Sequence, residues 1–139
     1  MASKSKALYF DLAHGASGDM LLASLIDAGI EPGPIVETLG SLDISGWSIS
    51  PRKIERYGLR GTSLRVECPD ERSERHLHDI EILIRNSGLP DIASGNIIRV
   101  FRKLAAAEAA VHGTTADMVH FHEVGAMDSI LDIAAFCIA

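Results

Sequence analysis

The sequence predicts an α+β fold in which helices pack on one face of a mostly antiparallel sheet, in a split βαβ-like order. Short alternating or apolar runs are typical of strands, and longer periodic segments closed by glycine are typical of helices. In chain order these segments read β-α-α-β-β-α-α-β-α. We expect a flexible N-terminus over residues 1–6 and a single domain over residues 7–139. The domain is expected to be truncated at its C-terminal end, because the last helix carries no stop signal.

The first half of the chain supplies a strand, two helices and a hairpin. Residues 7–12 are an apolar run with two aromatic rings, which predicts a buried strand. A helix is predicted over residues 17–28, and a shorter one opened by prolines ends near residue 39. Two further strands, at residues 47–54 and 62–68, alternate polar and apolar side chains. A glycine-punctuated connection predicts that they form a hairpin.

The second half of the chain is predicted to be mainly helical. Residues 76–87 read as a helix, and an alanine-rich helix with the helical period follows and ends at Gly113. A short strand over residues 119–122 then precedes a closing apolar helix over residues 126–139. The apolar residues near the end of that helix predict an exposed edge, and therefore a tendency to form a homo-oligomer.

The run Val-His-Phe-His-Glu at residues 119–123 concentrates side chains that bind metals. In a strand, the two apolar residues of the run would face the core while His120 and His122 share the other face. Their Cβ atoms would lie roughly 6–7 Å apart, close enough for both imidazoles to bind one ion. Glu123 follows directly and adds a carboxylate. The alternative is an ordinary solvated strand face.

Other potential ligands lie before and after this run. Asp128 and Asp132 are spaced to share one helix face, and of the two Asp128 is predicted to be a ligand. Asp11, at the end of the first strand, could bind metal or orient a histidine, or simply cap its surroundings. His76 and His78 form a second pair that could hold an additional metal only from a non-helical segment. As N-terminal residues of a helix they would not face each other.

A glycine-containing turn between the first strand and the first helix is a candidate phosphate site. Free backbone N–H groups and the helix dipole can hold an anion there, although the turn lacks the lysine of a Walker A loop. The alternative is that its aspartate is a favourable first-turn charge. Two arginines beside glycines in the hairpin could grip a phosphate, or form a solvated hairpin tip. The candidate cofactor-binding residues are Gly15, Ser17, Gly18 and Asp19 in the turn, and Arg56 and Arg60 in the hairpin.

Composition excludes several classes of partner. The formal net charge of −6 disfavours nucleic-acid binding and mildly favours cations. No apolar run approaches the ~20 residues that a membrane span needs, and the N-terminus does not read as a signal peptide. Cys68 and Cys137 are isolated in the sequence, which suits a reducing cytoplasm and disfavours a disulfide framework.

Four ordered blocks resemble the N-terminal region of the LarC-type nickel insertion proteins. They read LYFD with GASGDMLL at residues 8–22, GLRGT at 58–62, RHLHDI at 75–80 and HFHEVGAMDSILDI at 120–133. The resemblance implies binding of nickel and its insertion into a pyridinium bisthiocarboxylate mononucleotide, a lyase-type chelatase activity. The product would be the nickel-pincer cofactor of lactate racemase-like enzymes.

The resemblance also implies partners. These are the pyridinium mononucleotide, the C-terminal part of the same protein and a lactate racemase-like apoenzyme. CTP with manganese or magnesium is implied only for the absent C-terminal part, so we expect this chain to be inactive alone. Many members carry a histidine-rich tract before the RHLxDI block. Residues 68–75 contain no histidine here, which predicts that nickel storage is lacking.

Two other functions stay open from the residues alone. The first is a non-catalytic metal-carrier module that acts only when joined to a partner. The second is a metal-dependent phosphate-ester hydrolase that uses Asp11, Asp19, His120 and His122 on a catalytic ion. Nickel that co-purifies without turnover would favour the carrier, and release of phosphate from a nucleotide would favour the hydrolase.

Overall fold

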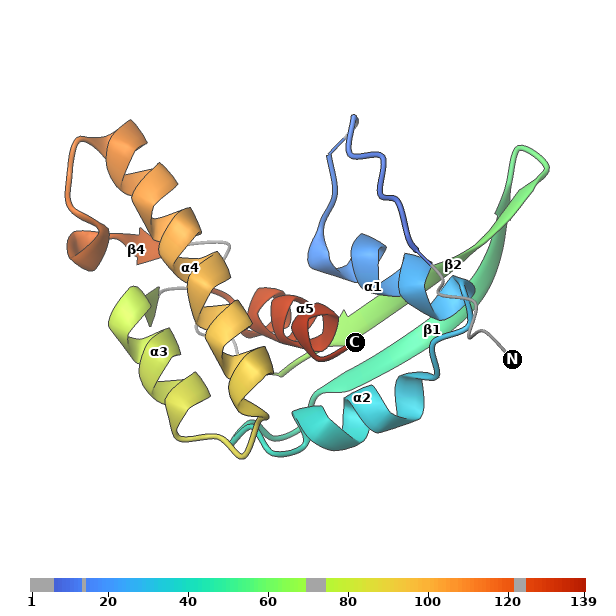
Figure 1. The fold of residues 1–139 in the computed structure, drawn as a ribbon, viewed down its shortest axis with the longest axis horizontal. Helices are drawn as coiled ribbons and strands as arrows, with labels where there is room; N and C mark the ends of the chain where they lie inside the picture. The colour runs from blue at the N-terminus through green and yellow to red at the C-terminus, as the bar shows by residue number, and fades with distance from the viewer. Residues whose placement is uncertain (1–6, 14, 70–74, 122–124) are drawn as a thin grey trace, which may run out of the picture.

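The computed structural model describes residues 7–13, 15–69, 75–121 and 125–139, and it has an α+β fold that is mostly helical (Figure 1). In chain order the elements are α1 (Gly18–Asp27), α2 (Pro32–Leu39), β1 (Ser48–Arg56), β2 (Leu59–Glu67), β3 (Arg75–His76), α3 (Leu77–Arg85), α4 (Asp91–His112), the short 3₁₀ helix η1 (Ala116–Met118), β4 (His120–Phe121) and α5 (Met127–Ile138). The helices predicted from the sequence are all present, with ends shifted by one to a few residues.

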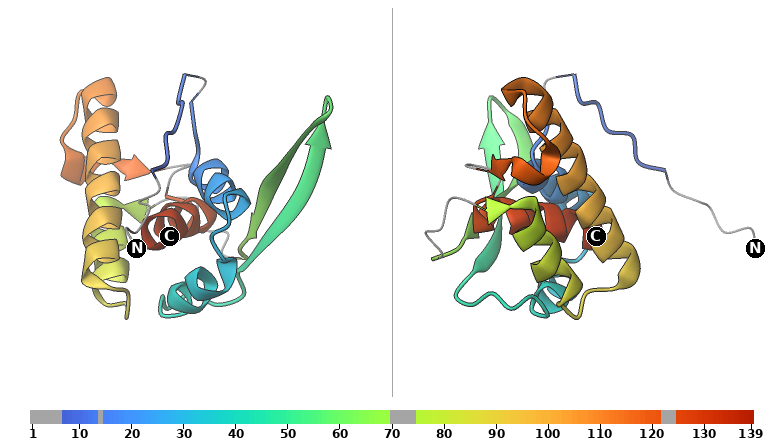
Figure 2. Two further views of the ribbon diagram at one scale, coloured as in Figure 1. Left: turned by 45° about the vertical axis from the view of Figure 1, so that its right-hand side comes forward. Right: turned by 90° about the vertical axis from the view of Figure 1, so that its left-hand side faces the viewer.

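Helix α5 lies at the centre of the molecule. Its apolar residues recur at intervals of one, three and four positions, and Ile130, Leu131, Ala134 and Ala135 have no exposed surface. Helices α3 and α4 lie on one side of it, and α1, α2 and the β1–β2 hairpin lie on the other (Figures 1 and 2). Full burial of an isoleucine or leucine side chain contributes about 1.5–3 kcal/mol, so Ile130 and Leu131 make α5 a main part of the hydrophobic core.

The predicted hairpin is confirmed. Strands β1 and β2 pair in antiparallel register from Ser48 opposite Glu67 to Arg56 opposite Leu59. The two turn residues between them, Tyr57 and Gly58, both have positive φ, which is the conformation that favours a tight two-residue hairpin. Leu64 of β2 is buried, and β2 packs against α1.

The base of α1 is joined to the hairpin by a small polar network. The carboxylate of Asp27 accepts hydrogen bonds from Lys53 at 2.7 Å and from Thr62 at 2.6 Å. The hydrogen bond from Lys53 is the main cause of a lowered pKa for Asp27. Because the side chains of Lys53 and Asp27 are largely exposed, the network orients the hairpin more than it stabilises the fold.

A second, very short sheet joins two distant parts of the sequence. Strand β3 pairs in antiparallel register with β4, with Arg75 opposite Phe121 and His76 opposite His120. Phe121 is buried and His120 is exposed, as the alternation of residues 119–121 predicts. His122 and Glu123 lie outside the described residues.

Two parts of the predicted architecture are wrong. Within the described ranges the strands form two separate two-stranded sheets, and the helices surround α5 rather than one sheet face. Residues 7–12 form no strand either: Leu8, Tyr9 and Leu12 are exposed, and Phe10 contacts Phe136 of α5 edge to face. An apolar run predicts burial, but it does not specify which strand, if any, would pair with its backbone.

No helix in the described ranges is long and apolar enough to cross a membrane.

Candidate metal and substrate site

The β3–β4 ladder brings two histidines together from separate sequence blocks. The rings of His76 and His120 have centroids 4.0 Å apart, and their planes are inclined by 53°. His76 is also the residue that precedes α3, and its backbone N–H donates to the carboxylate of Asp79 at 3.0 Å. The sequence predicted this helix-start position but not the histidine opposite it. His120 lies opposite His76 because β3 and β4, which are distant in the sequence, pair in this register.

His78 does not share this location. It lies within α3, two residues after His76, and it is exposed. Its side chain borders a separate polar cavity with Glu81, Arg102 and Asp117. The predicted pair His76–His78 is therefore split between a strand and a helix.

Gly125, shortly before α5, packs closely against both histidine strands. A Cβ atom added to Gly125 would lie 2.6 Å from the carbonyl oxygen of Phe121 and 3.2 Å from the backbone nitrogen of Arg75. The guanidinium of Arg75 donates a hydrogen bond of 2.6 Å to the carbonyl oxygen of Gly125. This packing places the start of α5, and with it Asp128, directly after the histidine ladder.

The predicted carboxylate ligands are engaged locally. Asp128 is exposed and accepts the backbone N–H of Ser129 at 2.7 Å. Asp11 is also exposed and accepts the backbone N–H of Ala13 at 3.0 Å, which forms a turn. Within the part of the chain that the structure describes, no three His, Cys, Asp or Glu side chains are placed to hold one ion. His76 and His120 together supply two potential ligands.

The glycine turn lies directly before α1, and the N–H of Gly15 donates to the carbonyl oxygen of Leu12 at 2.9 Å. Gly15 has a φ of 78°, and the carboxylate of Asp19 accepts hydrogen bonds from the Ser17 hydroxyl and, at 2.8 Å, from the backbone N–H of Met20. The Asp19 side chain is thus used at the start of the helix, where a negative charge also complements the helix dipole.

Gly18 lets α1 approach α5 closely at Asp132. A Cβ atom at Gly18 would lie 2.8 Å from the Cβ of Asp132 and 2.9 Å from its backbone carbon. One carboxylate oxygen of Asp132 is buried and lacks a hydrogen-bond partner among the described residues. Burial, followed by the nearby charges of Asp19 and Asp128, raises the pKa of Asp132 to about 7. The sequence predicted only that Asp132 shares a helix face with Asp128.

A largely apolar cavity of about 420 Å³ opens beside this carboxylate. One end carries Asp132 together with the hydroxyls of Ser17 and Ser129. The remaining walls are apolar side chains from α1, α4 and α5: Leu21, Val100, Leu104, Ile133 and Phe136. No lysine or arginine among the described residues lines the cavity. A lining of this kind suits an apolar group that carries positive charge.

The hairpin arginines lie apart from the glycine turn. Arg56 is the last residue of β1, at the hairpin tip, which points away from α1 and the turn before it (Figures 1 and 2). Arg60 donates to Glu55 across the hairpin at 3.3 Å. The glycine turn and the hairpin arginines, which together formed the predicted phosphate site, therefore do not lie close together in the structure.

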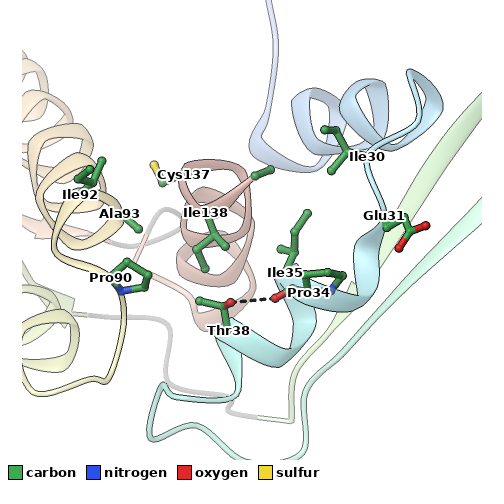
Figure 3. A pocket seen from close by; sticks show the side chains of 11 residues that line it. Ile30, Glu31, Pro34, Ile35, Thr38, Pro90, Ile92, Ala93, Cys137 and Ile138 are labelled. Atoms are coloured by element: carbon green, nitrogen blue, oxygen red, sulfur yellow. Dashed lines mark hydrogen bonds between the residues drawn. The ribbon is translucent and has the colours of Figure 1, made fainter.

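A third hollow, of about 450 Å³, lies between α2, the start of α4 and the end of α5 (Figure 3). Its lining is mainly apolar, with Ile30, Ile35 and Ile138 among the side chains drawn. Cys137 also lines it, but burial raises the pKa of that thiol, which makes it a poor metal ligand at neutral pH. The groove offers apolar contact rather than metal chemistry.

The partly buried Asp132 carboxylate is expected to make stability depend on pH. Its raised pKa means that the folded state holds the proton more tightly, so this group favours folding below about pH 4. That contribution is lost as the pH rises through about 7. The free energy of unfolding of Asp132→Asn, relative to that of the wild type, should therefore rise by about 1–2 kcal/mol between pH 4 and pH 8. This range allows for the partial exposure of the side chain.

Urea unfolding of both proteins at several pH values measures this difference. Asp117→Asn, at an exposed aspartate of η1, is the matched control and should leave the pH profile unchanged. A difference between Asp132→Asn and wild type that stays constant across the range would show that Asp132 titrates normally.

The amino-acid sequence is similar to those of known nickel insertion proteins. The family model described as nickel insertion protein matches residues 8–139. A pyridinium-3,5-bisthiocarboxylic acid mononucleotide nickel insertion protein of Desulfitobacterium hafniense is 41% identical over 128 residues, which is 92% of this chain and 32% of that protein. The protein of the same name from Staphylococcus epidermidis is 38% identical over 97% of this chain and 34% of its own length.

A putative nickel insertion protein of Roseiflexus castenholzii is 44% identical over 92% of this chain and 32% of its own length. The chain thus spans about a third of the length of the curated relatives it matches. No solved structure gives a significant match.

Proposed function

This chain belongs to the nickel insertion protein family, and on that premise we propose that it binds nickel and delivers it for insertion into a pyridinium bisthiocarboxylate mononucleotide. Such a product would be the nickel-pincer cofactor of lactate racemase-like enzymes. The chemistry would be that of a lyase-type chelatase. We propose that the complete protein carries it out, with CTP and manganese or magnesium used outside this segment.

The observation that carries the proposal is the close approach of Gly125 to the two histidine strands. Gly125 lies two residues before α5 and packs against Phe121 and Arg75, which brings the start of α5 near the histidine ladder. His120 and Asp128 are both exposed there and accessible to an ion. We propose that the nickel ligands come from this junction and from the N-terminal segment: His120, His122, Glu123, Asp128 and Asp11.

Donor chemistry supports nickel at this place. Imidazole suits divalent nickel, and affinity in the first-row series is high for nickel. A histidine nitrogen binds metal only when it is deprotonated, so nickel affinity should fall as the solution is acidified. A site of imidazoles and carboxylates with open positions can pass its ion to sulfur ligands, whereas a closed thiolate cage would hold it.

We further propose where the mononucleotide lies. The apolar cavity beside Asp132 suits a pyridinium ring, because the ring faces are apolar and its positive charge would complement the buried carboxylate. We propose that the turn at Gly15 and Gly18 holds the phosphate through the backbone N–H of Gly18, since the N–H of Gly15 already donates to the Leu12 carbonyl oxygen at 2.9 Å. The negative charges of Asp19 and Asp132 oppose an anion there, so a bound cation would have to bridge them.

A phosphate-ester hydrolase is less well supported. Such an enzyme would need Asp11, Asp19 and the histidines around one catalytic ion. Among the described residues, Asp11, Asp19 and His120 are not grouped around one ion. A carrier that binds nickel without turnover remains the second candidate, because the two paired histidines leave most coordination positions open.

Titration of nickel into the wild type and into the variant His120→Ala/His122→Ala tests the proposal. We expect the double substitution to weaken nickel binding by on the order of 100-fold or more, because two nitrogen ligands are lost. His112→Ala, at an exposed histidine paired with Glu108 on α4, should bind as the wild type does. Unchanged affinity in the double variant would contradict the proposed site.

A further inference from the structure

We infer that His76 and His120 bind one divalent ion together, so that the ion cross-links strands β3 and β4. The inference depends on the proposed function for the identity of the metal as nickel, but its geometry stands on the fold alone. It differs from a site within the HFH run, because one ligand comes from the RHLHD block.

The geometry of the two rings fits shared coordination. A divalent first-row metal binds histidine nitrogen at about 2.0–2.1 Å, so two nitrogens on one ion lie about 3–3.5 Å apart. Ring centroids 4.0 Å apart bring the two imidazoles close enough for side-chain rotation to place one nitrogen of each on a shared ion. The 53° inclination of the rings is unlike a parallel stack.

The backbone holds both histidines in place without the metal. They are directly opposite in an antiparallel ladder, where Cβ atoms lie about 4.5–5.5 Å apart. The Asp79 carboxylate fixes the backbone of His76, and the hydrogen bond from Arg75 to Gly125 fixes the strand beside it. The His76 side chain also accepts the backbone N–H of Asp79 in a capping box. A neutral imidazole has one acceptor nitrogen, so a bound metal would replace this hydrogen bond, and only the backbone positions of the two histidines are set in advance.

The pair is open to solvent on the metal side. His120 is exposed and His76 is half-buried, so an ion bound by both would keep free positions for other ligands. Sulfur atoms of an incoming thiocarboxylate could occupy these positions. Two protein nitrogens and an open face are the arrangement from which an ion can be handed over.

The inference predicts that nickel stabilises the ladder. A two-residue strand pair has few hydrogen bonds of its own, and a ligand that binds only the folded state raises stability. Wild-type protein with saturating nickel should therefore melt at a higher temperature than the metal-free protein. His76→Ala and His120→Ala should each lose this increase and weaken nickel binding at least about tenfold.

His78→Ala is the matched control, because His78 is an exposed histidine two residues away that faces another cavity. It should keep both the nickel affinity and the increase in melting temperature. Wild-type behaviour of His76→Ala, or an equal loss in His78→Ala, would overturn the inference. The melting temperature of each variant without nickel identifies any variant that fails to fold.

Nuclear magnetic resonance of the wild type provides a test that needs no variant. Bound Ni²⁺ should give contact shifts, which require a metal–nitrogen bond, to the imidazole ring protons of both His76 and His120 and not to those of His78 and His112. A contact shift for His120 without one for His76 would overturn the inference and leave the proposed function intact. Contact shifts for both rings with no transfer of nickel to the mononucleotide would support the pair and contradict the proposed function.

Discussion

Gly125→Val is expected to destabilise the protein by about 3 kcal/mol or more, the largest effect predicted for any single change considered. The added Cβ would lie 2.6 Å from the Phe121 carbonyl oxygen and 2.8 Å from the Phe121 Cβ. Real Cβ atoms do not approach backbone so closely, and Phe121 is itself packed in the core against Phe101. Either β4 or the start of α5 must move, and overpacking of this kind typically costs 1–3 kcal/mol or more.

Urea unfolding monitored by circular dichroism measures the loss. Gly95→Ala is the matched control, since Gly95 lies within α4 and an added Cβ there meets no atom within 4 Å. That change should stabilise the protein by up to about 1 kcal/mol, because alanine is the better helix former. Wild-type stability of Gly125→Val would mean that the junction between β4 and α5 is looser than the structure describes.

Gly18→Val is expected to have the second largest effect, a loss of about 2–4 kcal/mol. Its side chain would fall within 2.9 Å of both the Cβ and the backbone carbon of Asp132, at the contact between α1 and α5. Backbone atoms of a central helix cannot move aside cheaply. Gly61→Ala, in β2 with no neighbour within 4 Å of the added Cβ, is the control and should be close to neutral.

The same contact affects how nucleotide binding is tested. Loss of mononucleotide binding in Gly18→Val would reflect the displaced helices rather than a missing phosphate contact. Full native stability together with selective loss of nucleotide binding would instead show that the turn serves the phosphate alone. Chemical denaturation and nucleotide titration of one preparation separate these two results.

Local sequence patterns were sufficient to predict most elements of the fold. The helical period, with a glycine stop for every helix but α5, indicated α1 to α5, and alternation with a glycine turn indicated the β1–β2 hairpin. One failure lies at residues 7–12, where a strand-forming run is largely exposed and Phe10 contacts Phe136 of α5. Strand formation depends on a neighbouring strand, and a single sequence does not specify that neighbour.

The sequence predicted the local positions of individual site residues but not which of them lie close together. The exposed position of His120 follows from period-two alternation, and the shared face of Asp128 and Asp132 follows from the helical period. The proximity of His76 to His120 and the burial of Asp132 against Gly18 arise from contacts between distant segments. The apolar residues beside Asp132 in the sequence were the one available indication of its burial.

The most direct test of the account is nickel transfer from this chain to its proposed acceptor. Wild-type protein loaded with nickel and separated from free metal is mixed with the pyridinium bisthiocarboxylate mononucleotide, and the mass of the nucleotide is measured with the remaining polypeptide and CTP supplied. We predict a nickel-containing nucleotide with wild type and none with His120→Ala/His122→Ala. Equal nickel incorporation by the two proteins would contradict the claim that this junction delivers the metal.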